Sequence, residues 1–314
     1  RGAKMPTYKP EGMLIDTVPN RQAFKSMTAL MEAQASGRIL ESRAIVCDSN
    51  HNLIVDMGAW RGIIPRDEAA LGIAEGTTRD IAIISRVNKP VCYRITGFER
   101  GGEGIVIPQL SRRAVQQECQ DTYISKLVPG DVIDAKVTHL ESFGCFVDIG
   151  CGLPSLIPID AISVSRIAHP RDRFTPAQDI KAVVKAVEPD GRVSLTHKEL
   201  LGTWSENAAL FSPGETVAGI VRSIEDYGVF VELAPNLAGL AEPREGVTVG
   251  QHASVYIKSL IPEKMKAKLI IVDAFDAGWR AAPTPYFITE GHISRWQYSP
   301  ACSDRLIETV FDPA

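Results

Sequence analysis

The sequence predicts an all-β protein made of tandem five-stranded OB-fold barrels joined by short helical linkers. The main observation is a repeat: residues 143–146 (FGCF) return downstream as residues 227–230 (YGVF), and their neighbours keep the same offset. The second observation is that short strand-like runs, separated by turn residues, surround each copy at regular spacing. Five strands that close on themselves are the strand count of an OB-fold.

The repeats also set the expected domain organisation. A chain of 314 residues suits two to four domains. An earlier stretch is a degenerate third copy, because Gly37 and Pro65 stand where the second copy has Gly130 and Pro158. The expected segments are an N-terminal leader and helix (1–36), the degenerate first repeat (37–118), the second repeat (128–198), the third repeat (212–273) and a C-terminal extension (274–314).

The two ends of the chain differ from the repeats. Residues 1–20 contain several prolines and few periodic apolar positions, which predicts an irregular leader. A helix is expected over residues 21–36, where apolar side chains recur at helical spacing and Gly37 can cap the end. Residues 274–314 form an aromatic tail that is too short to fold alone and is expected to dock on a domain.

Short strands are predicted throughout the first two repeats. In the first repeat they are 39–47, 53–57, 62–65, 81–86, 91–96 and 104–110, with a helical turn after Asp67. In the second repeat they are 132–140, 143–149, 153–159, 180–187 and 192–196. Residues 111–126 predict a polar helical connector, and residues 198–211 predict one linking helix with an apolar face.

The two aromatic pairs, Phe143 with Phe146 and Tyr227 with Phe230, are candidates for a binding surface. Side chains alternate across a strand, so rings three positions apart do not share a face of a regular strand. A glycine inside a strand commonly marks a bulge, and a bulge at Gly144 is expected to turn both rings outward. Rings presented side by side can stack on successive bases. Burial in the core is the alternative, and the polar tip of Tyr227 favours exposure.

Positive charges lie near the aromatic pairs in the sequence. The candidates for phosphate contact are Arg166, Arg171 and Arg173 in a loop of the second repeat, and Lys264, Lys266 and Lys268 in the third. The three lysines alternate, so a strand would place them on one face. For any single residue a solvated surface is the alternative, and the clustering beside aromatic positions favours RNA contact.

Composition limits the function classes. With 34 Lys and Arg against 38 Asp and Glu, the formal net charge is -4, so nucleic-acid binding requires local positive patches. No apolar run approaches the ~20 residues that span a bilayer, and the first residues lack a secretory signal. The cysteines show no metal-ligand spacing and are expected to be buried free thiols. Because catalytic and nucleotide-binding motifs are missing, we expect no enzyme, no cofactor and no metal.

Three segments of the second repeat resemble the RNA-binding repeat of the ribosomal protein S-one family. They are residues 129–137 (PGDVIDAKV), 143–150 (FGCFVDIG) and 191–198 (GRVSLTHK). The resemblance covers about residues 37–273, and it is strong in the second and third repeats and weak in the first. It implies OB-fold barrels that bind single-stranded RNA on one face, with the leading degenerate repeat docking on the ribosome.

The resemblance also implies site residues by position. The family uses two aromatics, a histidine in the third strand, and an acidic-basic pair around the last turn. At these positions the sequence has the aromatics Phe143, Phe146, Tyr227 and Phe230, and the pair Glu188 and Arg192. The histidine is absent, and its place is taken by Pro65, Pro158 and Glu242. Lys268 is the nearest counterpart of the arginine in the third repeat.

The sequence therefore predicts a single-stranded RNA or mRNA binding protein of the bacterial cytoplasm, associated with the small ribosomal subunit and translation. The expected partners are RNA and small ribosomal subunit proteins, with no membrane. The alternative is a ribosome-associated protein-interaction scaffold with little RNA affinity, which the acidic total charge and the missing histidines favour. A role as the accessory part of a ribonuclease has only family analogy behind it.

Overall fold

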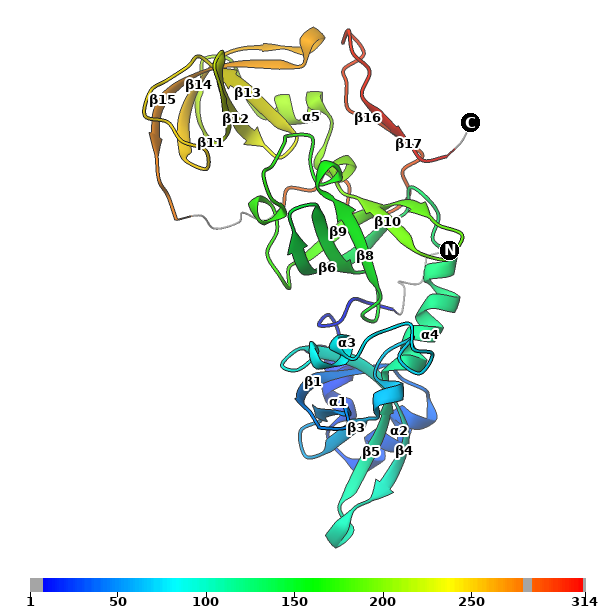
Figure 1. The fold of residues 1–314 in the computed structure, drawn as a ribbon. Helices are drawn as coiled ribbons and strands as arrows, with labels where there is room; N and C mark the ends of the chain where they lie inside the picture. The colour runs from blue at the N-terminus through cyan, green and yellow to red at the C-terminus, as the bar shows by residue number, and fades with distance from the viewer. Residues whose placement is uncertain (1–7, 279–283, 313–314) are drawn as a thin grey trace. The chain divides into compact units, whose positions relative to one another are not determined.

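The chain folds mainly into strands that close into three barrels (Figure 1). The computed structural model describes residues 8–278 and 284–312. Each barrel has five strands, which confirms the predicted fold class. The chain divides into two compact units. The first comprises Arg1–Leu127, Asp134–Lys136 and Asp148–Pro154, and the second comprises Val128–Ile133, Val137–Val147 and Ser155–Ala314.

Two short helices, α1 (Val18–Ala23) and α2 (Met27–Ala35), replace the single helix predicted over residues 21–36. The single-helix prediction was wrong because Ser26 has an extended backbone and starts a new helix. Its Oγ accepts a hydrogen bond from the backbone N–H of Ala29 at 3.1 Å. Gly37 follows α2 with a φ of 58°, the left-handed conformation expected of a cap.

Residues 8–17 form turns rather than a helix or strand, and residues 1–7 lie outside the described part of the chain. Buried carboxylates hold this segment. Glu41 accepts the backbone N–H groups of Leu14 and Ile15 at 2.8 and 2.6 Å, and burial raises its pKa to about 7. Glu11 pairs with both nitrogens of the Arg112 fork at 2.7 and 2.9 Å. The leader is therefore anchored by hydrogen bonds and not only by apolar contacts.

The first barrel has the strand order β1-β2-β3-β5-β4. Its strands are β1 (Leu40–Cys47), β2 (Leu53–Asp56), β3 (Arg61–Ile64), β4 (Pro90–Arg100) and β5 (Val106–Ser111). The strand predicted over residues 81–86 was wrong, because the short helix α3 (Ile81–Ile84) occupies this stretch. Only Ile83 of its isoleucines is buried. A helical turn satisfies its own backbone groups, as in the 3.0 Å bond from Ile84 N–H to the Asp80 carbonyl, without a neighbouring strand.

The second and third barrels contain every strand predicted for the second repeat and five more in the third. The second barrel joins β6 (Val132–Glu141), β7 (Gly144–Asp148), β8 (Pro154–Pro158), β9 (Asp179–Val187) and β10 (Val193–Thr196). The third joins β11 (Thr216–Glu225), β12 (Gly228–Ala234), β13 (Leu237–Ala241), β14 (His252–Ile261) and β15 (Lys266–Phe275). Both are closed, with orders β10-β8-β7-β6-β9 and β11-β12-β13-β15-β14.

Helical segments follow the first and second barrels. The connector predicted over residues 111–126 contains α4 (Arg112–Thr122) and a 3-10 turn at Ile124–Lys126. The single helix predicted over residues 198–211 was wrong. The 3-10 helix η6 (Lys198–Leu201) and α5 (Trp204–Ala208) are separated by Gly202, whose φ is 85°. A Cβ at Gly202 would lie 2.7 Å from the Phe287 ring, so this break also makes room for the C-terminal extension.

The C-terminal extension forms a small hairpin, β16 (Arg295–Gln297) and β17 (Glu308–Val310). Its aromatic side chains Trp296, Tyr298 and Phe311 are buried in one apolar cluster with Trp204 of α5 and Leu237 of β13. In the described part of the chain, none of the helices is long and apolar enough to span a bilayer.

A single asparagine connects the third barrel to three other segments of the second unit. Asn236, between β12 and β13, accepts the backbone N–H of Val164 at 2.9 Å. Its amide donates to the carbonyls of Lys198 and Gly202, both at 2.8 Å. Its backbone carbonyl oxygen accepts a hydrogen bond from the Tyr298 hydroxyl at 2.6 Å. A loop of the second barrel, the linker and the extension are thus fixed at one fully buried residue.

The close packing at Gly144 can be tested by adding one methyl group. A Cβ at Gly144 would lie 2.6 Å from the Ile157 carbonyl oxygen, so Gly144→Ala should lower the free energy of unfolding by ~1–3 kcal/mol through overpacking. The control is Gly97→Ala in β4, where nothing lies within 4 Å and a gain of ~0.5–1 kcal/mol is expected. Urea unfolding followed by circular dichroism measures both. Equal stability of Gly144→Ala and wild type would contradict the packing.

Candidate nucleic-acid interface

The structure brings the predicted aromatic pairs together on the surfaces of two barrels. In the second barrel the Phe143 and Phe146 ring centroids are 5.9 Å apart, edge to face, and Phe143 is 55% exposed. In the third barrel Tyr227 and Phe230 are 6.2 Å apart in the same arrangement, and Tyr227 is 66% exposed. Phe146 and Phe230 are half-buried. Each pair therefore offers one ring free to solvent and one supported by the barrel.

The glycine between the two rings has a different role from the predicted one, which was to form a bulge that turns both rings outward. Phe143 and Tyr227 lie in turns just before β7 and β12, so strand alternation does not govern them. In the third barrel Gly228 pairs directly with Glu225, with no extra residue between them, so the expected bulge is not there. Gly144 instead allows β8 to approach, since a Cβ would lie 2.6 Å from the Ile157 carbonyl oxygen. The rings share a face because of the turn, and the glycine allows close strand packing.

A bulge does occur in the fourth strand of every barrel. The residue left out of the pairing is Thr96 in β4, Lys185 in β9 and Lys258 in β14. A bulge redirects a side chain, and in both barrels with aromatic pairs the redirected residue is lysine. The sequence analysis missed these two lysines. A lysine at the same bulge in two repeats could have identified them. The bulge is defined by the pairing register of the strands, which the sequence does not show.

The third barrel gathers rings and cations around one open cleft of about 550 Å³. Tyr227 and Phe230 lie on one side, and Lys258, Lys266 and Lys268 belong to the strands that line the other. This arrangement combines apolar ring faces for bases with ammonium groups for phosphates.

Lys264 does not share a strand face with Lys266 and Lys268, so that expectation was wrong. It ends the 3-10 helix η7 (Pro262–Lys264), and Met265 then takes a left-handed φ of 48° before β15 begins. The assignment of Lys268 as the counterpart of Arg192 is also wrong. Lys268 pairs with Leu240, as Ser194 pairs with Leu156 in the second barrel, so Lys268 takes the place of Ser194.

The predicted arginines of the second repeat separate into two groups. Arg166 and Arg171 are exposed, whereas Arg173 is 9% exposed and donates to both oxygens of Glu232 at 2.6 and 2.8 Å. Arg222 of β11 donates to the same carboxylate at 3.0 Å. Burial alone raises the pKa of Glu232, but the two guanidinium groups outweigh it and hold that pKa below its usual value. Arg173 therefore joins two barrels instead of facing solvent.

Glu188 and Arg192 were predicted as an acidic-basic pair at the last turn of the second barrel. Both are exposed, and the Arg192 guanidinium pairs with Asp190 at 2.7 Å. Glu188 contributes through its backbone, whose N–H donates to the Arg192 carbonyl at 2.8 Å. The tight Pro-Asp-Gly turn thus holds the Arg192 side chain beside that of Asp190.

A histidine stands beside the aromatic pair of the second barrel, although Pro158 occupies the position where the resemblance implies one. His139 lies on β6 with its ring 6.3 Å from that of Phe146, and its Nε2 lies 2.5 Å from Glu141. His139 was not predicted as a site residue, because the resemblance places the histidine of the family in the third strand. By contrast, His197 is fully buried, and burial lowers its pKa to about 4.

The first barrel presents a different surface. It has no aromatic pair at the equivalent place, and its shallow cleft is lined by Ile54, Trp60, Ile63, Ile105 and Ile107 among others. Over residues 8–278 and 284–312, no group of three His, Cys, Asp or Glu side chains could hold a metal ion. Within the described residues, the second and third barrels are therefore the ones that carry an aromatic pair.

Comparisons with known proteins give a matching family model and several relatives. Residues 126–198 match the family model described as S1 RNA binding domain. Small ribosomal subunit protein bS1 of Staphylococcus aureus is 28% identical over 264 residues, which cover 79% of this chain and 64% of that protein. The bS1 homolog of Bacillus cereus is 29% identical over 81% of this chain and 68% of its own length. The chain thus spans about 64% of the length of the Staphylococcus aureus relative.

Among solved structures, a Streptococcus pneumoniae multidomain protein with nucleic acid binding domains aligns with 76% of this chain and 74% of its own. The sequence identity is 13% and the TM-score is 0.25.

The buried ion pairs around Glu232 predict how the two barrels respond to mutation and pH. Glu232→Gln leaves Arg173 and Arg222 without a counter-charge and should lower the free energy of unfolding by on the order of 3 kcal/mol. Because the folded-state pKa of Glu232 is lowered, this stabilisation is present above the ordinary glutamate value of ~4.3 and is lost as the pH falls below it. Urea unfolding at neutral and acidic pH measures both effects. The exposed Glu245→Gln is the control, and equal losses in the two variants would refute the assignment.

Proposed function

We propose that this chain, which contains an S1 RNA binding domain and is a relative of small ribosomal subunit protein bS1, binds single-stranded RNA on its second and third barrels. The observation that carries the proposal is the two aromatic pairs, Phe143 with Phe146 and Tyr227 with Phe230, each with one exposed ring at an equivalent place on its barrel. We further propose that it acts in the bacterial cytoplasm in association with the small ribosomal subunit and with mRNA.

Base stacking is the first part of the proposed mechanism. Each exposed ring can receive one base, and such stacking contributes ~1–3 kcal/mol per base without strong sequence preference. The edge-to-face partner fixes each exposed ring from behind, which reduces the side-chain entropy lost on binding.

Phosphate contact is the second part. In the third barrel Lys258, Lys266 and Lys268 lie around the cleft that holds the rings. In the second barrel Lys185 occupies the matching bulge, and Arg192 is exposed at the last turn. Local clusters of this kind reconcile RNA binding with a net charge of -4, because phosphate attraction depends on charges within about one Debye length.

The proposal is tested by removing the rings. Phe143→Ala with Phe146→Ala, and separately Tyr227→Ala with Phe230→Ala, should each weaken binding of an unstructured RNA by roughly ten- to several-hundred-fold. The matched control is Phe275→Ala, which removes a 47% exposed ring that does not line the cleft of the third barrel. Fluorescence anisotropy at two salt concentrations gives the Kd. Wild-type affinity in both double variants would rule out stacking on these rings.

A second candidate function is a protein-interaction scaffold, and the first barrel favours it for that part of the chain. Its cleft is apolar and lacks the aromatic pair, so it suits a protein partner such as a small ribosomal subunit protein better than RNA. Pull-down of the full chain from lysate before and after nuclease treatment separates the two functions. Partners that all survive complete RNA digestion would favour the scaffold.

A further inference from the structure

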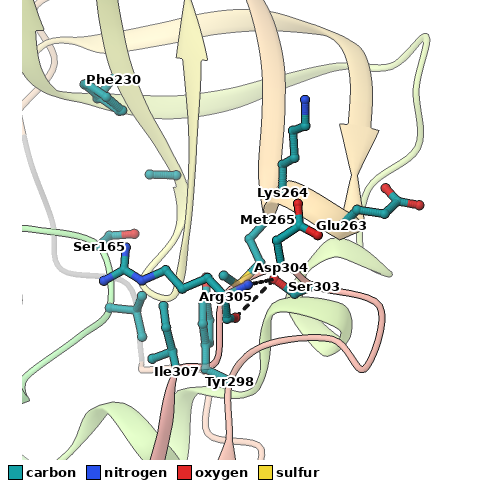
Figure 2. A pocket seen from close by; sticks show the side chains of 12 residues that line it. Ser165, Phe230, Glu263, Lys264, Met265, Tyr298, Ser303, Asp304, Arg305 and Ile307 are labelled. Carbon is teal, nitrogen blue, oxygen red and sulfur yellow. Dashed lines mark hydrogen bonds between the residues drawn. The ribbon is translucent and has the colours of Figure 1, made fainter.

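The C-terminal extension completes a second cavity next to the cleft of the third barrel. This cavity, of about 510 Å³, is lined by Phe230, Ala238 and Met265 of the third barrel region and by Tyr298, Ser303, Asp304, Arg305 and Ile307 of the extension. Val164, Ser165, Glu263 and Lys264 complete it. Figure 2 shows these side chains around the cavity.

The two hollows are adjacent, because Phe230, Ala238 and Met265 line both. The second cavity therefore lies next to the aromatic pair of Tyr227 and Phe230. The extension thus lengthens the surface of the third barrel with residues that the barrel itself does not supply.

Donor groups in this cavity lack partners of their own. The Ser165 side chain is 7% exposed, and its Oγ is buried without a hydrogen-bond partner. A buried hydroxyl left unpaired is unfavourable, and it invites a ligand atom that accepts a hydrogen bond. Figure 2 shows the Arg305 side chain reaching across the cavity to the side where Ser165 lies.

Arg305 is exposed and carries the charge needed for an anion. Its backbone N–H is held by the Ser303 hydroxyl at 3.2 Å, while its guanidinium has no ion-pair partner within the described residues. The guanidinium fork suits phosphate oxygens, and the Ser165 hydroxyl is a second donor on the lining of the same cavity. Lys264 adds a second cation on the lining.

Two carboxylates, Glu263 and Asp304, also line the cavity and make its charge mixed. Such acceptors repel a bare phosphate, but they can accept hydrogen bonds from a ribose hydroxyl or a base amino group. The combination of donors and acceptors therefore suits a whole nucleotide better than an isolated anion.

We infer that this cavity binds the nucleotide that follows the bases stacked on Tyr227 and Phe230, with its phosphate at Arg305 and Ser165. The inference rests on the proposed RNA binding of the third barrel. It gives the C-terminal extension a role in holding RNA in addition to packing against the barrels.

Two variants of the full chain test this inference with RNAs of about five and about fifteen uridines, chosen against the ~4–16 nucleotides that one OB fold covers. Arg305→Gln should weaken binding of the long RNA by about two- to fivefold, as expected for one exposed charge contact. It should also reduce the slope of log K against log salt by about 0.7, the value for one phosphate on a single strand. Ser165→Ala should not lower the stability of the free protein, because its hydroxyl has no partner to lose, and should weaken binding of the long RNA. Because the nucleotide that follows a stacked base is within reach of about five uridines, the short RNA should lose affinity in the same direction.

The matched control is Arg38→Gln, which removes an exposed arginine that lines neither hollow. Wild-type affinity and an unchanged salt slope for Arg305→Gln with both RNAs would overturn the inference. Tyr227→Ala separates this result from failure of the proposed function. If Tyr227→Ala weakens binding and Arg305→Gln does not, only the second cavity is excluded. If wild type binds neither RNA, the proposed function itself fails.

Discussion

The second unit depends on the buried polar contacts that tie its two barrels together. Asn236 alone fixes a loop of the second barrel, the linker and the extension, and all of its amide hydrogen bonds are made inside the protein. Glu232 adds a second connection by neutralising Arg173 and Arg222. Buried groups of this kind have strict geometric requirements, because each unpaired atom would carry the full cost of its lost hydration. They therefore specify one arrangement of the two barrels, which apolar packing alone would leave less defined.

This fixed arrangement matters for the stacking proposed for the aromatic pairs. A ring that stacks on a base is useful only if it is held in place before the base arrives. The turn before β7 or β12 positions the exposed ring, and the strand positions its partner. The glycine between the two rings lets the neighbouring strand approach closely. The fourth-strand bulge then directs a lysine outward at an equivalent place in both barrels. The same backbone in the first barrel carries Thr96 and Ile54, so the surface changes while the fold does not.

The fold was predictable because it follows from repetition and strand spacing, which the sequence displays directly. Its exceptions are local: Ser26 and Gly202 break predicted helices through capping and a positive φ, and residues 81–84 form a helical turn where an apolar run predicted a strand. The aromatic pairs were also predictable as neighbours. What could not be predicted was the role of each cation, because that depends on pairing register and on contacts between distant segments. Arg173 meets Glu232 from another barrel, and Lys258 faces the cleft only because of a bulge.

The same reasoning explains how an acidic chain can present a surface for RNA. Several of its basic residues are taken up in buried pairs, such as Arg112 with Glu11 and Arg173 with Glu232, so their charge is cancelled inside the protein. The cations left at the surface of the third barrel are a few lysines placed around two rings. A site with few phosphate contacts has a shallow dependence on salt, whereas stacking on rings is insensitive to it. Under the proposed function, affinity would therefore depend less on overall charge than on the placement of the aromatic side chains, which the barrel and its buried polar contacts maintain.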